Sequence, residues 1–329
     1  SVTGQLEKQW LHFRSEKWPI PVLTTLTSLG TVNDLCGVTL SEALDVYVRL
    51  KGGEKGIKFI RHATRSTNYA IEAVGDHDLT SYDGKARGVL RDALLDRGLV
   101  SSSAKRVFAS VRAMVNFVIC EYGLKATNPF LHVFFPELND TKKRMPFSTM
   151  EIRLLHDKCR STDDDVRHLA ALISDTGVRL AEATGLKVSD IKIGGPIPYI
   201  HIRPNPIRRL KTKQSERQVP LIGASLWAAK RILATSSGDY AFPRYVKNGT
   251  CLANSASAIL NKWIRSNIGN DLVVHSMRHK FRDRLREVGC PPEITDSLGG
   301  WSRNSIGESY GDGYSLKAKH EWLSKITLE

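Results

Sequence analysis

Apolar residues recur at helical spacing through the first half of the chain. The clearest stripe, formed by valines at positions 107, 111, 115 and 118 together with Ile119, predicts a helix over residues 103–122. Further helices are predicted over residues 86–95 and after Ser41, which is a candidate N-cap. We therefore expect a helical domain over residues 38–135, whereas residues 1–37 show no informative pattern.

The second half of the chain mixes helical spacing with short alternating runs. Residues 136–146 are polar and bounded by prolines, as is typical of a linker, and Ser148 with Glu151 forms a capping box that opens the next helix. Residues 199–203 and 217–221 alternate apolar and polar positions, which predicts a β-hairpin. We therefore expect a mainly α chain with a small antiparallel β-sheet, whose second, α+β domain spans residues 147–329.

Arg179 is the first candidate for site chemistry. Gly177 interrupts one helical pattern and an apolar face resumes at Leu180, so Arg179 is expected at the start of a helix. There its planar guanidinium can hold two phosphate oxygens, and the helix N-terminus adds positive potential. The alternative is an ordinary surface arginine paired with Glu182, a contact worth only about 0.2–0.5 kcal/mol.

The predicted hairpin is strongly basic between its strands. We expect an exposed tip that carries Arg208, Arg209, Lys211 and Lys213. A lysine at this tip can protonate a leaving oxygen if a neighbouring cation lowers its pKa. The alternative is a basic loop that touches phosphates without specificity.

Two further groups of candidate site residues lie nearer the C-terminus. His275 and Arg278 lie three residues apart on a predicted helix, so they face the same way and can serve one phosphate. Tyr310 is a potential nucleophile only if neighbouring groups take its proton, because a phenol has a pKa near 10. Taken singly, these residues also fit a solvated helix face and a buried tyrosine, and Trp301 fits a core residue.

The order and spacing of these residues resemble the tyrosine recombinases, the phage-integrase class. The shared pattern is Gly-x-Arg-x-x-Glu, a hairpin lysine before Val-Pro-Leu, His-x-x-Arg, and an aromatic residue followed nine positions later by tyrosine. Trp301 stands where a histidine is commoner in the family, and one extra glycine precedes it. Tyr314 is the rival nucleophile. The six matching positions, expected to be catalytic, are Arg179, Lys211, His275, Arg278, Trp301 and Tyr310.

The helical first half supports the same resemblance. Residues 97–106, 123–124 and 128–129 are similar to the core-DNA-binding domain of the family, so the resemblance covers roughly residues 38–323. It implies a two-domain clamp around duplex DNA. A solvated charge run is the alternative reading of residues 142–144. The candidate DNA-binding residues are Lys105, Arg106, Lys142, Lys143, Arg144, Arg208, Arg209 and Lys213.

Charge and composition agree with a polyanionic partner. The chain of 329 residues carries a net charge of +14, with 17 lysines and arginines against 15 acids in residues 1–140 and 31 against 19 in the rest. A nucleic acid should therefore meet chiefly the second half. We expect no membrane segment, because the sequence contains no long apolar run and no basic amphipathic helix.

The cysteines are odd in number and scattered, without the paired spacing of a zinc site. They favour a reduced compartment, and a cytoplasmic protein is expected. The sequence begins without methionine, so a missing upstream domain stays open. The cysteines are Cys36, Cys120, Cys159, Cys251 and Cys290.

The resemblance implies site-specific DNA cleavage and rejoining through a 3′-phosphotyrosyl link, without metal or other cofactor, for a mobile element or prophage. It also implies a homotetramer on two DNA attachment sites, with or without DNA-bending accessory proteins. The tail after Tyr310 then docks on a neighbouring subunit, although packing within its own chain fits the sequence equally well. The other readings are a non-catalytic DNA-binding relative and a type IB-like topoisomerase.

Overall fold

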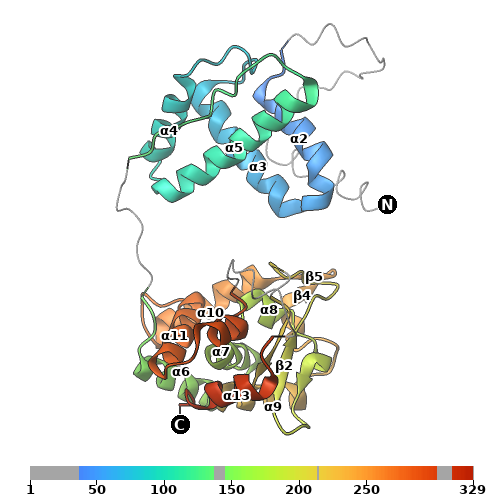
Figure 1. The fold of residues 1–329 in the computed structure, drawn as a ribbon, viewed down its shortest axis with the longest axis vertical. Helices are drawn as coiled ribbons and strands as arrows, with labels where there is room; N and C mark the ends of the chain where they lie inside the picture. The colour runs from blue at the N-terminus through green and yellow to red at the C-terminus, as the bar shows by residue number, and fades with distance from the viewer. Residues whose placement is uncertain (1–36, 137–144, 213–214, 302–312, 329) are drawn as a thin grey trace. The chain divides into compact units, whose positions relative to one another are not determined.

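The chain forms two compact units, Ser1–Lys142 and Lys143–Glu329, in a computed structural model (Figure 1). The structure describes residues 37–136, 145–212, 215–301 and 313–328. The division falls within the linker expected over residues 136–146, while the finer domain limits stay predictions.

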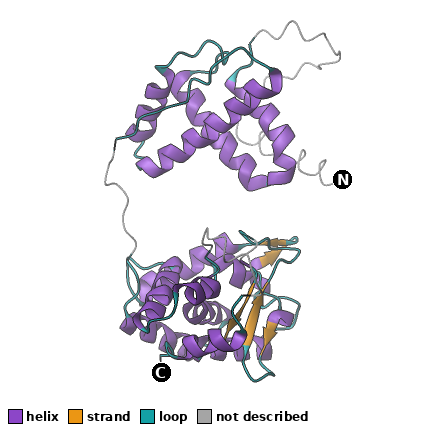
Figure 2. Ribbon diagram, viewed as in Figure 1, coloured by secondary structure: helices purple, strands orange, loops and turns teal. Residues whose placement is uncertain are grey.

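The described part of unit 1 is built from helices (Figure 2). Thr39, and not Ser41, begins the first of them: its side chain accepts from the backbone of Glu42, whose carboxylate in turn accepts from the Thr39 backbone. Ser41 lies inside the first helical turn, so the N-cap predicted there was wrong by two residues. The helices are α2 (Leu40–Lys55), α3 (Ile57–Val74), α4 (Ala86–Asp96) and α5 (Ser101–Tyr122).

The predicted valine stripe of α5 faces the core of unit 1. Val107, Val111, Val115 and Val118 are all buried there, and α5 packs against α2, α3 and α4. No helix among the described residues is long and apolar enough to cross a membrane.

The helices of unit 2 gather around α7 (Asp165–Thr176). This helix is buried from His168 to Thr176 because α6, α9 and α11 pack against it. Ser148 caps α6 with Glu151 as predicted. The surrounding helices are α6 (Thr149–Thr162), α8 (Leu180–Thr184), α9 (Gly223–Thr235), α10 (Ala253–Asn267), α11 (Val274–Glu287), α12 (Pro292–Gly299) and α13 (Leu316–Ser324).

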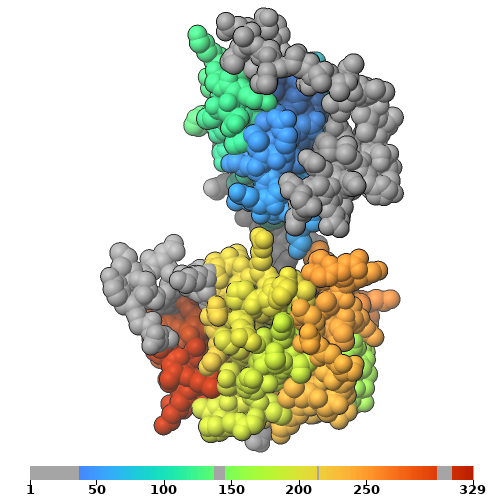
Figure 3. Space-filling model, turned by 90° about the vertical axis from the view of Figure 1, so that its right-hand side faces the viewer, coloured from blue at the N-terminus to red at the C-terminus, as the bar shows by residue number. Residues whose placement is uncertain are grey.

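A small antiparallel sheet lies at one side of these helices (Figure 2). Its strands are β1 (Ile191–Lys192), β2 (Tyr199–Ile202) and β3 (Arg217–Pro220), in that order, with Ile200 opposite Val219 and Ile202 opposite Arg217. A second hairpin pairs β4 (Val246–Lys247) with β5 (Thr250–Cys251). In the space-filling view, the yellow-green and yellow segment with β2 and β3 and the orange segment with β4 and β5 share one face of unit 2 (Figure 3). The predicted hairpin and the predicted fold class are confirmed.

The C-terminal tail packs within its own chain. Leu323 and Ile326 are buried in the core of unit 2, and α13 contacts β3. The Arg284 guanidinium also donates to the backbone carbonyl of Ile326. Of the two arrangements that the sequence left open for this tail, the structure shows the one in cis.

Candidate active site

Arg179 owes its position to the glycine two residues before it. Gly177 ends α7 in a left-handed conformation, with φ of 59°. A Cβ at this position would lie 2.3 Å from the Phe281 ring, so both the turn and the close packing require glycine. The chain then places Arg179 as the N-cap of α8, as predicted from the break in periodicity.

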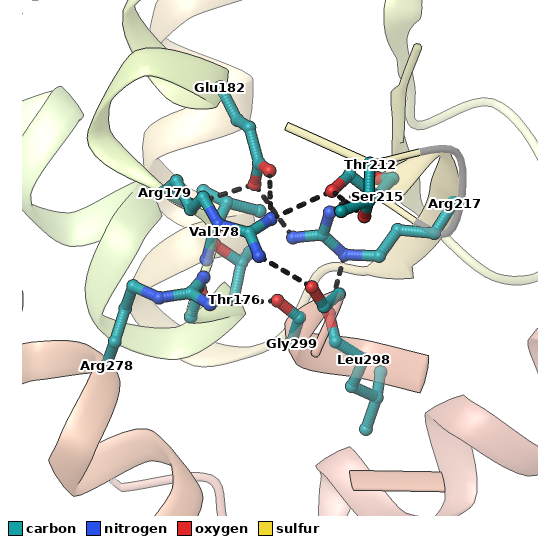
Figure 4. Close-up of polar contacts among 12 residues, drawn as sticks. Thr176, Val178, Arg179, Glu182, Thr212, Ser215, Arg217, Arg278, Leu298 and Gly299 are labelled. Carbon is teal, nitrogen blue, oxygen red and sulfur yellow. Dashed lines mark hydrogen bonds and ion pairs between the residues drawn. The ribbon is translucent and has the colours of Figure 1, made fainter. Parts of the chain in front are cut away.

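Glu182 is the acidic centre of the site. Its Oε1 accepts from Arg179 Nη1 at 2.7 Å, and its Oε2 accepts from Arg217 Nη2 at 2.9 Å and from the Arg179 backbone at 2.8 Å (Figure 4). The Glu182 side chain is buried. Arg179 is therefore the paired arginine that the sequence offered as an alternative, but its partner is buried and the half-buried pair orients its guanidinium inside the site.

The electrostatics of the cluster keep Glu182 ionised. Burial acts to raise the pKa of Glu182, but the charge and hydrogen bond of Arg217 and the donors of Arg179 outweigh it and hold this pKa below its ordinary value. A charged carboxylate in turn compensates the two arginines, one of which is itself buried.

Three arginines meet the C-terminal end of one helix. The successive carbonyls of α12 and its cap accept in order: Leu298 from Arg217 Nε at 2.8 Å, Gly299 from Arg278 Nη2 at 2.9 Å, and the Gly300 carbonyl from Arg179 Nη2 at 2.7 Å (Figure 4). The last carbonyls of a helix have no partner inside it and carry its negative end charge. The end of α12 thus gathers cationic side chains from α8, β3 and α11.

Arg278 is buried and reaches this helix end from α11. Its Nη1 also donates to the Gly177 carbonyl, so one guanidinium links the turn before Arg179 to the end of α12. Burial, with the charges of Arg217 and Arg179, lowers the pKa of Arg278 to about 9, while Glu182 acts to raise it. The side chain therefore remains charged at neutral pH.

Trp301 packs directly on this cluster. The guanidinium carbons of Arg278 and Arg282 each lie 4.9 Å from the centroid of the indole ring, a distance that permits cation–π attraction. Both positions before Trp301 require glycine, one because of close packing and the other because of its backbone angle. A Cβ on Gly299 would lie 1.9 Å from the Trp301 ring, and Gly300 has φ of 63°. The extra glycine noted in the sequence thus closes α12 and lets the indole fold back.

His275 lies one helical turn before Arg278 on α11 and is exposed. Its ring centroid lies 5.1 Å from that of His279. His275 and Arg278 border a pocket of about 300 Å³ whose walls are otherwise partly apolar, with Ile173 and Leu180 among them. The predicted pairing of His275 with Arg278 on one side of a helix is therefore present.

The basic hairpin differs from the sequence prediction at one residue. Arg209 and Lys211 are exposed in the segment between β2 and β3. Arg208, however, is only 4% exposed, and its guanidinium donates to the backbone carbonyls of Glu182 and Arg203. The prediction of Arg208 at an exposed tip was wrong, because it satisfies carbonyls beneath α8 instead.

The structure describes only some of the remaining candidates. In the described part of the tail, the rival nucleophile Tyr314 is 41% exposed. On α5 of unit 1, the DNA-binding candidates Lys105 and Arg106 are exposed. The candidates outside the described residues are Tyr310, Lys142, Lys143, Arg144 and Lys213.

Sequence reasoning missed Arg217. The sequence did carry a sign of its burial: Arg217 lies two residues before Val219 on a predicted strand, so both side chains should face the core.

In unit 1, Arg106 borders a pocket of about 500 Å³ with three residues that were not anticipated, His62, Arg65 and Tyr69. Burial and the charges of Arg65 and Arg106 lower the pKa of His62, in keeping with a basic pocket.

Comparisons with known proteins agree on one family. The sequence model of the phage integrase family matches residues 147–314. The tyrosine recombinase XerD of Corynebacterium glutamicum is 27% identical over 229 residues, covering 65% of this chain and 71% of that protein.

Solved structures show the same fold at low identity. The Tn1549 transposon integrase in complex with transposon right end DNA has a TM-score of 0.65 at 16% identity, covering 88% of this chain and 99% of that one. A lambda integrase tetramer bound to a Holliday junction has a TM-score of 0.61 at 16% identity, with 87% and 82% covered.

Proposed function

This chain belongs to the phage integrase family, the tyrosine recombinases, and we propose that it cleaves and rejoins DNA at specific sites through a 3′-phosphotyrosyl link to Tyr310. The observation that carries this proposal is the convergence of Arg179 and Arg278 on adjoining carbonyls at the end of α12. Two guanidiniums held side by side suit the two non-bridging oxygens of one phosphate.

The first step forms a bond between the Tyr310 oxygen and the DNA phosphorus and breaks the bond from phosphorus to the 5′ oxygen. Arg179 and Arg278 neutralise the charge that builds on the non-bridging oxygens. A guanidinium carries five N–H donors, so each arginine can hold protein carbonyls and a phosphate together. Rejoining reverses these bonds. The scheme uses no nucleotide because the covalent link conserves the bond for rejoining, and it uses no metal because the arginines and the lysine supply the positive charge.

The remaining candidates supply proton transfer and packing. Lys211 protonates the departing 5′ oxygen, with Lys213 as the rival for this role. His275 takes the proton of Tyr310 or donates to the phosphate. Trp301 cannot act as an acid or base, so its part is to pack on Arg278 and to offer one indole N–H.

DNA contacts come from both units in this proposal. Unit 1, within which we place a helical DNA-binding domain over residues 38–135, contributes the basic pocket that holds Arg65 and Arg106. The second domain, residues 147–329, contributes Arg209 and the basic tip around Lys211. Lys105 and the run at residues 142–144 add further phosphate contacts.

The assembly and the setting follow from the relatives. The lambda integrase is bound to its Holliday junction as a tetramer, and the Tn1549 protein belongs to a transposon. We accordingly propose a homotetramer on two duplexes that serves a mobile element or prophage in the cytoplasm, with or without DNA-bending accessory proteins.

The target site is found in the same experiment that tests the function. A pool of duplexes with a randomised central segment and a nick in one strand is mixed with the protein, and complexes that survive detergent are sequenced. Two copies of the enriched site on a supercoiled plasmid should then give deletion or inversion products. Relaxation without exchange would point to a topoisomerase, and binding without any covalent complex to a non-catalytic relative.

A further inference from the structure

Arg217 is a buried arginine that no catalytic role explains. It is 6% exposed, and its guanidinium donates in three directions: to Leu298 O at 2.8 Å, to Ser215 O at 2.7 Å and to Glu182 Oε2 at 2.9 Å (Figure 4). It therefore joins three parts of unit 2, namely the end of α12, the segment just before β3, and α8. At this depth its contacts are with the protein, so it acts through its neighbours.

Two of its neighbours lead directly to the arginines that we assign to the phosphate. Glu182, held by Arg217 on one oxygen, holds Arg179 on the other. The carbonyl that Arg217 holds at Leu298 precedes those held by Arg278 and Arg179. A shift of Arg217 must consequently move both the acid and the helix end that orient the phosphate-binding pair.

We propose that Arg217 is a positioning residue for DNA cleavage, which locks the end of α12 to Glu182 and so fixes where Arg179 and Arg278 hold the phosphate. This inference rests on the function proposed above. It also predicts that Gly300 is required, since a Cβ there would lie 2.7 Å from Arg217 Nη1.

Lysine should not replace Arg217 in this position. A guanidinium presents donors along a rigid fork, whereas an ammonium is a point charge on a flexible stem. Lysine keeps the charge that faces Glu182 but cannot reach the carbonyls of Leu298 and Ser215 with the same geometry. Methionine removes the charge and the donors while filling a similar volume.

The charge of Arg217 should also affect the pH dependence of cleavage, which a purely structural role would leave unchanged. The other cations around Glu182 are Arg179 at the start of α8, Arg208 between β2 and β3, and Arg278 on α11. Arg217 is the strongest of the groups that lower the pKa of Glu182 against its burial. In Arg217→Met this pKa should rise, and Glu182 should lose its charge as the pH falls through the new value.

The test is single-turnover cleavage of the enriched nicked duplex as a function of pH, with DNA affinity and thermal unfolding measured alongside. We expect Arg217→Met and Arg217→Lys to cleave roughly 10- to 100-fold more slowly, because small misplacements of reacting groups cost about that much. Only Arg217→Met should also lose rate on the acid side. DNA affinity should change by no more than about threefold, because Arg217 lies beneath the phosphate-binding groups and not among them.

Gly300→Ala is the second variant and has a matched control. Gly123 caps α5 with nearly the same backbone angles, φ 60° and ψ 30° against 63° and 39°, but a Cβ there meets nothing within 4 Å. Gly123→Ala therefore carries the same backbone strain without the clash. Gly300→Ala should cleave at least about tenfold more slowly, as expected for misplaced groups, and Gly123→Ala should cleave at the wild-type rate.

The results that would overturn the positioning role of Arg217 differ from those that would overturn the proposed function. Wild-type rates in Arg217→Met and Gly300→Ala, or an equal loss in Gly123→Ala, would overturn the positioning role while leaving the proposed function intact. An Arg217→Met variant that cleaves slowly with the wild-type pH profile would reduce Arg217 to a structural part. A wild-type protein without a covalent complex would overturn the proposed function, and the positioning role with it. If Arg217→Met does not fold, the decision passes to Arg217→Lys and Gly300→Ala.

Discussion

Arg179 and Glu182 form a doubly connected pair: Arg179 Nη1 lies 2.7 Å from Glu182 Oε1, and the Arg179 backbone nitrogen lies 2.8 Å from Oε2. The first contact fixes the guanidinium and the second fixes the start of α8. An arginine held in this way loses little further freedom when it binds an anion, so the pairing supports the phosphate-binding role that we propose for Arg179.

Removing the Glu182 carboxylate should destabilise unit 2 strongly. Glu182→Ala leaves the buried Arg217 without its compensating charge, and breaking such a pair costs about 3–5 kcal/mol. Urea unfolding followed by tryptophan fluorescence measures the change. Asp283→Ala is the control, because Asp283 pairs with Arg286 at the exposed surface and such a pair contributes at most about 1 kcal/mol. Equal losses in the two variants would contradict the buried cluster.

Lys211→Ala should slow cleavage by roughly 10²- to 10⁴-fold, the usual contribution of a general acid. A substrate with sulfur at the 5′-bridging position should restore the rate, because a thiolate leaves without protonation. Lys213→Ala, assayed on both substrates, is the matched control, since Lys213 lies two residues away on the same segment. Rescue of Lys213→Ala instead of Lys211→Ala would move the role to Lys213.

His156 should make the stability of unit 2 fall on the acid side of neutrality. Its ring is buried, with Nε2 2.8 Å from Ser174 Oγ. Burial lowers the pKa of His156, as do the charges of Arg284 and Arg160, against the opposing effect of Asp175 and Asp157.

The lowered pKa of His156 determines how stability changes with pH. Below the ordinary histidine pKa of about 6.5 the unfolded chain takes up a proton that the folded chain refuses, so stability declines as the pH falls, by at most about 1.4 kcal/mol per pH unit. Unfolding in urea between pH 7.5 and 5 should show a shallower decline for His156→Gln than for the wild type. Parallel declines would show that this histidine titrates freely in the folded protein.

The C-terminal tail should contribute to the stability of its own subunit. Leu323 is completely buried in the core of unit 2, so Leu323→Ala should lower the free energy of unfolding by about 2–5 kcal/mol. Deleting residues from 315 onward should destabilise the unit and not merely weaken assembly, which corrects the simpler expectation for a tail that docks on a neighbour. Lys317→Ala on the exposed side of α13 is the control. A truncated protein as stable as the wild type would contradict this packing.

Local patterns predicted much of the fold. The periodicity over residues 103–122, the break at Gly177 and the alternation on either side of the basic tip each depend on neighbours in sequence. For the same reason the start of α8 at Arg179 and the shared side of His275 and Arg278 could be placed. The exception was the first N-cap, where Thr39 and Ser41 both precede acceptable helix starts and only the reciprocal bond with Glu42 decides.

Contacts between distant segments could not be predicted in this way. Arg208 and Arg209 are adjacent in a basic stretch, yet the first is buried because the carbonyls of Glu182 in α8 and of Arg203 just after β2 lie within its reach. Arg217 meets Leu298 across 81 positions of the chain. Such pairs depend on tertiary packing, so spacing in the sequence carries no direct sign of them.

Trapping the covalent intermediate tests whether Tyr310 is the nucleophile. The protein is mixed with the enriched nicked duplex, labelled on the strand that it cleaves, and run on a denaturing gel beside Tyr310→Phe and Tyr314→Phe. We expect a slow-migrating labelled band in the wild type and in Tyr314→Phe, and none in Tyr310→Phe. A band that persists in Tyr310→Phe, or that disappears only in Tyr314→Phe, would show that Tyr310 is not the nucleophile.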